Sequence, residues 1–191
     1  DEVFADYVDD DLDRAASKRP DGRSRRVPCI AAETTEALTF SLGGLSKSCG
    51  MPQLKLGWIA VGGPPDLAAG ALDRLDLIAD TYLSVATPVQ GALGDLLAVG
   101  SAIRATIAAR IATNRRTLAA VAGADSPLTP LRSEGGWSAI VRVPAVRTDE
   151  EWALSLLEEG AVLCHPGYFF DLQAAAFLVF TTSTWEKPCL V

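Results

Sequence analysis

The sequence predicts an α/β fold that ends in a small α+β domain. Residues 37–42 alternate apolar and small polar types and residues 54–61 are mostly apolar, as expected of strands. Between residues 66 and 121, apolar side chains recur every three or four positions, as they do on one face of a helix. Beyond Gly123 the segments become shorter and alternate between the two patterns.

In the first half of the chain, residues 14–36 begin with a polar, basic stretch that predicts a surface loop inserted before the first strand. Gly43-Gly44 is expected to end that strand, which places Lys47 at a strand end. After the strand of residues 54–61, a helix is expected from Asp66 to about Leu83. We expect one face of this helix to be buried, formed by Leu67, Ala71, Leu75, Ile78 and Tyr82.

A further helix is expected to begin near Pro88, and residues 100–124 predict a long helix. The segments that follow predict strands at 138–143, 162–164 and 177–181, with a helix at 149–159. Thr148 and Glu151 have the spacing of a capping box, in which each residue binds a backbone N–H group at the start of a helix.

Composition narrows the classes of function. The 191 residues are 49% hydrophobic with a net charge of −7, which disfavours a general nucleic-acid or anionic-membrane surface. The sequence shows neither a signal peptide nor an apolar run of about 18 residues, so we expect a soluble protein. The basic stretch could touch nucleic acid, but no aromatic residues interleave with its charges, which favours a solvated loop.

The cysteines and the single histidine narrow the classes of function further. The four cysteines are widely spaced and form no CxxC pair, which predicts reduced thiols and a cytoplasmic location; they are Cys29, Cys49, Cys164 and Cys189. His165 is the only histidine, so neither a serine-type triad nor a multi-histidine metal site is supported, and we expect no metal.

Lys47 is the strongest candidate for covalent chemistry. An amine attacks a carbonyl only where its surroundings disfavour the ammonium form, and the flanking Leu42-Gly43-Gly44-Leu45 supplies an apolar, open approach. Lys55 follows eight positions later and could hold an anion. The pattern predicts a Schiff-base lysine at Lys47.

Four segments carry a family resemblance. Ser46-Lys47 with Lys55-Leu56-Gly57-Trp58 resembles the pyridoxal-phosphate lysine region of class I/II aminotransferases of fold type I. The opening Asp1-Glu2-Val3-Phe4 resembles the family's Asp-Glu-Val-Tyr strand end. Residues 133–140 and 160–169 are similar to its Gly-Gly-aromatic and Pro-Gly-aromatic small-domain segments. The four lie in the family's order along nearly the whole chain.

The resemblance implies a role for each site residue. Asp1 would pair with the pyridine nitrogen of pyridoxal 5'-phosphate, and Lys55 and Ser46 would bind its phosphate. Lys47 would be both the covalent tether and the base that moves a proton. The implied activity is amino transfer between an amino acid and a 2-oxo acid through a Lys47 Schiff base, in a homodimer.

The resemblance also implies a domain layout. Residues 1–99 would be the C-terminal part of the cofactor-binding large domain, 100–124 the interdomain helix and 125–191 a small domain. We therefore expect this chain to be an incomplete fragment that is inactive alone. No arginine follows Arg147, although relatives commonly bind the substrate carboxylate with a C-terminal arginine.

Two alternatives remain open at this stage. A pyridoxal-phosphate lyase or decarboxylase would use the same lysine and aspartate, because a fold does not fix the reaction type. An aminotransferase-like, non-catalytic regulator domain would retain the same motifs.

Overall fold

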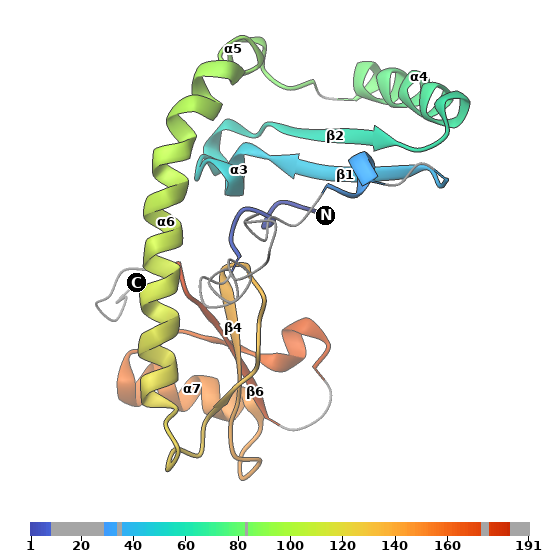
Figure 1. Ribbon diagram of the computed structural model, residues 1–191. Coiled ribbons are helices and arrows are strands. Elements are labelled where there is room, and N and C mark those ends of the chain that lie inside the picture. The colour runs from blue at the N-terminus through green and yellow to red at the C-terminus, as the bar shows by residue number, and fades with distance from the viewer. Residues whose placement is uncertain (9–28, 34–35, 83, 173–175, 184–191) are drawn as a thin grey trace, which may run out of the picture. The chain divides into compact units, whose positions relative to one another are not determined.

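The computed structural model of the protein describes residues 1–8, 29–33, 36–82, 84–172 and 176–183 (Figure 1). The described residues form two units, one of residues 1–8 and 29–106 and the other of residues 107–183. Each unit contains its own antiparallel sheet and its own helices. The predicted mixed α/β class is therefore confirmed.

The sheet of the first unit consists of β1 (Thr39–Gly44) and β2 (Gly57–Gly62), which pair from Thr39 with Gly62 to Gly44 with Gly57. Both predicted strands exist, but Gly43-Gly44 continues β1 and does not break it. The reason is packing: a Cβ atom on Gly43 would lie 2.4 Å from Nε1 of Trp58, its cross-strand neighbour. The Trp58 ring thus covers the space above Gly43 that a side chain would need.

The connection between these strands is tightly folded. It contains the four-residue helix α3 (Leu45–Ser48) and the 3-10 helix η1 (Pro52–Leu54). The carbonyl of Leu45 accepts hydrogen bonds from the amides of Cys49 and Met51, both at 3.1 Å. Leu45, Cys49 and Leu56 are buried and form the core beneath this connection. Lys47 therefore lies in a helical turn that directly follows the strand end.

Helix α2 (Ile30–Glu33) lies within residues 14–36, so the predicted loop is wrong for these four residues. Two distant side chains hold it: the Glu2 carboxylate accepts from the Ile30 amide at 2.9 Å, and the Ser41 hydroxyl accepts from the Ala31 amide at 3.3 Å. Residues 14–28 and 34–35 of the predicted loop lie outside the described residues.

Helix α4 (Pro65–Thr81) occupies the predicted segment, but its expected buried face is not buried. Of the five residues assigned to that face only Ala71 is buried, while Leu67, Ile78 and Tyr82 are more than half exposed. Within the part of the chain that the structure describes, this helix packs against β2.

Helices α5 (Thr87–Gly91) and α6 (Leu93–Val121) follow, and α6 begins at Leu93, earlier than the predicted 100. By length and composition α6 could cross a membrane. Its polar side chains instead bind protein groups: Arg104 donates to the Ser48 carbonyl, and Asn114 donates to the Thr182 carbonyl. Such bonds are typical of a helix that packs within a folded protein.

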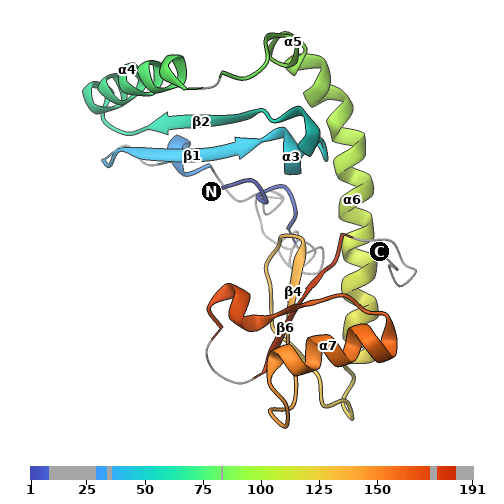
Figure 2. The same ribbon diagram turned by 180° about the vertical axis from the view of Figure 1, so that it is seen from behind.

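The second unit has a four-stranded antiparallel sheet in the order β3-β4-β6-β5. Its two central strands, β4 and β6, and the helix α7 are labelled in Figure 2. The strands are β3 (Thr129–Pro130), β4 (Ser138–Arg142), β5 (His165–Pro166) and β6 (Phe177–Thr181), and the helices are α7 (Asp149–Gly160) and the 3-10 helix η2 (Gly167–Phe170). Trp152, Ala153 and Leu156 of α7 pack against the buried core of the sheet. The predictions of β4, α7, β6 and the Thr148–Glu151 capping box are confirmed.

The strand predicted at 162–164 is wrong. Ala161 adopts a left-handed conformation (φ 51°) that ends α7, and the chain pairs with β6 only from His165, opposite Val179. Of the apolar residues before His165, Cys164 is buried in the core, whereas Leu163 is 60% exposed.

Candidate functional site

An open pocket of about 450 Å³ in the first unit brings together every residue that the sequence assigned to the site. Asp1, Ser46, Lys47 and Lys55 all line it, from three separate segments of the chain. Gly43, Gly44 and Gly57 form part of its wall without side chains. The pocket therefore combines one carboxylate, two amines and one hydroxyl with space beside the backbone.

Lys47 is held through its backbone. The Tyr7 hydroxyl donates a 2.6 Å hydrogen bond to the Lys47 carbonyl, and Arg104 Nη1 donates to the next carbonyl, that of Ser48, at 3.2 Å. Tyr7 is only 3% exposed, so its ring belongs to the core. The backbone that carries the candidate nucleophile is thus fixed by two side chains distant in sequence.

Lys55 stands in an unusual backbone conformation. It ends η1 with φ 52° and ψ 39°, in the left-handed region that favours glycine or asparagine. A lysine there costs about 1 kcal/mol relative to glycine. Ala161 and Asp171 end α7 and η2 in the same conformation, so at Lys55 it serves the end of η1 and does not by itself mark a function.

Asp1 is anchored by the segment that follows it. Its Oδ1 accepts from the Val3 amide at 3.1 Å, and the Glu2 amide donates to the Leu42 carbonyl of β1 at 2.9 Å. Phe4 also lines the pocket, 40% exposed. The segment that carries the Asp1 carboxylate is therefore hydrogen-bonded to β1, the strand that leads into α3.

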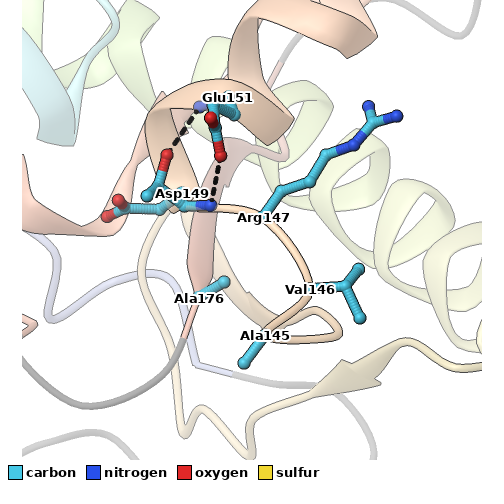
Figure 3. Close-up of a pocket in the computed structure, with 7 residues that line it drawn as sticks. Ala145, Val146, Arg147, Asp149, Glu151 and Ala176 are labelled. Carbon is cyan, nitrogen blue, oxygen red and sulfur yellow. Dashed lines mark hydrogen bonds between the residues drawn. The ribbon is translucent and has the colours of Figure 1, made fainter.

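A second pocket, of about 480 Å³, lies at the start of α7 in the second unit (Figure 3). Glu151 accepts from the Thr148 amide at 2.8 Å, and its own amide donates to the Thr148 hydroxyl at 3.2 Å. Arg147 donates to the Ser155 hydroxyl and lies over the Trp152 ring. Because these polar groups serve the helix start, we assign this pocket a structural role.

The structure gives His165 a packing role, and it shows an ion pair that the sequence did not predict. The ring of His165 lies 5.8 Å from that of Phe169 and 6.1 Å from that of Phe170, so it belongs to an aromatic cluster. Within the described ranges, no group of three or more His, Cys, Asp or Glu residues could hold a metal ion. Sequence reasoning missed Arg104 and Asp6, which form an ion pair at 3.4 Å, because no local pattern marks one arginine of α6 among four.

Comparison with known proteins identifies the family. The family model described as aminotransferase class I and II matches residues 1–184. The chain is 26% identical over 148 residues to glutamate-pyruvate aminotransferase AlaA of Haemophilus influenzae, which covers 74% of this chain and 37% of that protein.

Two solved structures show the same fold. An alanine aminotransferase from Pyrococcus furiosus aligns with a TM-score of 0.75 at 15% identity, over 97% of this chain and 44% of that one. YbdL from Escherichia coli, for which a methionine aminotransferase function is described, aligns with a TM-score of 0.67 at 19% identity, over 98% of this chain and 45% of that one.

The family model covers nearly the whole chain, and the solved structures share its fold. The chain belongs to the class I and II aminotransferase family. It spans less than half the length of these relatives.

Proposed function

We propose that the protein carrying this chain is a pyridoxal 5'-phosphate-dependent aminotransferase, which moves an amino group between an amino acid and a 2-oxo acid. One observation carries the proposal: in a chain of this family, one pocket is lined by all four residues that the chemistry needs. They are Asp1, Ser46, Lys47 and Lys55.

The donor set of this pocket fits the cofactor. A carboxylate at Asp1 suits a protonated ring nitrogen, and the amine of Lys47 suits an aldehyde. The amine of Lys55 and the hydroxyl of Ser46 suit a phosphate, which binds cations and hydroxyl donors.

Each residue then has a defined task. Pyridoxal phosphate, when bound, supplies an electron sink for the carbon that loses its proton. Lys47 would hold the cofactor through Nζ, and the same nitrogen, when free, would accept and return a proton. Asp1 keeps the ring nitrogen protonated by its negative charge. Lys55 and Ser46 fix the phosphate, so that the ring cannot rotate out of reach of Lys47.

We further propose that residues 1–99 belong to the cofactor domain, that α6 joins it to a small domain, and that the full protein is a cytoplasmic homodimer. The two units of the described residues divide within α6, after Thr106, which supports α6 as the joining helix but falls at neither proposed limit. Cys29, Cys49 and Cys164 are free thiols, which suits a reducing compartment. Amino acids and 2-oxo acids are the partners that the family implies.

Borohydride reduction followed by peptide mapping tests the proposal on the full-length protein. We expect a reduced pyridoxyl group on the peptide that contains Lys47. We also expect a new 2-oxo acid to form from one of a panel of amino acids with pyruvate as the amino acceptor, starting with glutamate, the donor named for the Haemophilus relative. Lys47→Ala is the control and should abolish both signals. A pyridoxyl group on another lysine would overturn the assignment.

A further inference from the structure

Helix α3 cannot fix Lys47 by itself. It has four residues, and an isolated helix of that length does not form in water, because nucleation is unfavourable. The last carbonyls of any helix also lack partners within the helix. In α3 these include the carbonyls of Lys47 and Ser48, so the position of Lys47 depends on groups supplied from elsewhere.

Arg104 supplies one of these groups, its guanidinium, which also contacts the N-terminal segment of the chain that carries Asp1. Its Nη1 donates to the Ser48 carbonyl at 3.2 Å and pairs with Oδ2 of Asp6 at 3.4 Å. Asp6 lies on the segment that begins with Asp1 and includes Tyr7, whose hydroxyl donates to the Lys47 carbonyl. A single guanidinium thus connects the segment of the candidate cofactor aspartate to that of the candidate nucleophile.

The packing of α6 explains why Arg104 is in reach. Gly100 of α6 lies against Cys49, the residue that follows α3, at a distance that leaves no room for a side chain. Arg104 is one helical turn further along, on the same face of α6. The side chains of Arg104 and Asp6 are 28% and 25% exposed, so their interaction is partly shielded from solvent.

We propose that Arg104 is a positioning residue for Lys47: oriented by Asp6 and assisted by Tyr7, it caps α3 and sets where the Lys47 amine lies relative to Asp1. The inference rests on the proposed function for the identity of the reacting amine. It assigns to Arg104 no contact with substrate or cofactor. The capping itself is a property of the cofactor-free protein and is testable there.

The first measurement is amide hydrogen exchange in the cofactor-free, full-length protein. Arg104→Met should speed exchange of the Cys49 and Met51 amides at least about tenfold, because a hydrogen bond from a charged donor is lost. Arg104→Lys should restore part of the protection, and exchange in α4 should stay as in the wild type. Arg116→Met is the matched control on the exposed side of α6 and should change neither region.

The second measurement is the pH midpoint of the absorbance of bound pyridoxal phosphate. Arg104→Met should shift this midpoint relative to Arg116→Met, with Arg104→Lys between them, whereas a merely structural role would lower thermal stability and leave it unchanged. Unchanged exchange at Cys49 and Met51, or an equal increase in α4, overturns the inference. If Arg104→Met does not fold, Asp6→Asn and Tyr7→Phe are measured in its place. Wild-type exchange rates at Cys49 and Met51 in both of these variants would equally overturn the inference. If the wild-type protein does not bind the cofactor at Lys47, the proposed function is overturned instead. The exchange measurement does not depend on that outcome, because it uses the cofactor-free protein.

Discussion

Gly100 of α6 and Cys49, next to α3, pack in direct contact. A Cβ atom built on Gly100 would lie 2.3 Å from the Cys49 sulfur and 2.6 Å from its Cβ. Cys49 has no exposed surface, so it cannot move aside into solvent. Only glycine at position 100 lets the long helix approach the turn that carries Lys47.

Gly100→Ala should therefore destabilise the protein by about 1–3 kcal/mol through overpacking, although alanine favours a helix by about 1 kcal/mol over glycine. Gly94→Ala is the matched control on the same helix, because nothing lies within 4 Å of a Cβ there. It should be neutral or stabilising. Urea denaturation measures both free energies of unfolding, and equal values would contradict the contact.

Replacing Lys55 should separate ligand binding from stability. Both Lys55→Ala and Lys55→Gly remove the cation, so both should weaken the affinity of the cofactor-free protein for pyridoxal phosphate. Only glycine relieves the left-handed backbone, so Lys55→Gly should be more stable than Lys55→Ala by about 1 kcal/mol. Cofactor titration and urea denaturation test the two effects. Unchanged affinity in both variants would make Lys55 a surface residue.

Glu2 should make the first unit sensitive to acid. The Ile30 amide, and less strongly the Ser41 hydroxyl, lower the pKa of the Glu2 carboxyl below its ordinary value of 4.5. The folded-state pKa is thus lower than the unfolded one. The stabilisation is full above about pH 4.5 and is lost as the pH falls through the folded-state pKa.

Glu2→Gln should accordingly reduce the stability at pH 7 and flatten its fall below pH 4.5. Thermal unfolding between pH 3 and pH 7 measures this, with Glu158→Gln on the exposed surface of α7 as the control. If the two variants follow the same curve, the bonds from Ile30 and Ser41 to Glu2 contribute nothing.

Cys164 should be unreactive in the folded protein. Burial raises the pKa of its thiol to about 11, so only about one molecule in a thousand carries the reactive thiolate at pH 8. Cys29 is partly exposed and should react first. Labelling with a thiol reagent in a Cys189→Ser background, followed by peptide mapping, tests the order. Labelling of Cys164 before unfolding would show that the core around it opens.

Local signals predicted the second unit well. The capping box at Thr148 and the apolar run of β6 are contained within a few consecutive residues, and the structure has both. The apolar run before His165 misled the prediction, because a left-handed Ala161 ends α7 and moves the paired segment onward. An apolar run does not reveal whether its residues pair in a sheet or only fill the core.

The residues of the candidate site could be predicted from the sequence, but the residues that hold them in place could not. Lys47 and Lys55 were singled out by their sequence pattern and Asp1 and Ser46 by the family resemblance, and all four line one pocket. The helical turn around Lys47 could not be predicted, since Tyr7 and Arg104, 40 and 56 positions from the carbonyls that they bind, hold it. Helix α2 depends in the same way on Glu2, 28 positions away.

The Trp58 indole gives the pocket an optical consequence. Its ring covers Gly43, which lines the pocket, and the other described tryptophans, Trp137 and Trp152, belong to the second unit. A chromophore that absorbs in the near ultraviolet and enters this pocket would quench the Trp58 fluorescence by energy transfer. In a variant whose other tryptophans, Trp137, Trp152 and Trp185, are replaced by phenylalanine, the emission of Trp58 should report occupancy of the site, without a label and before any turnover.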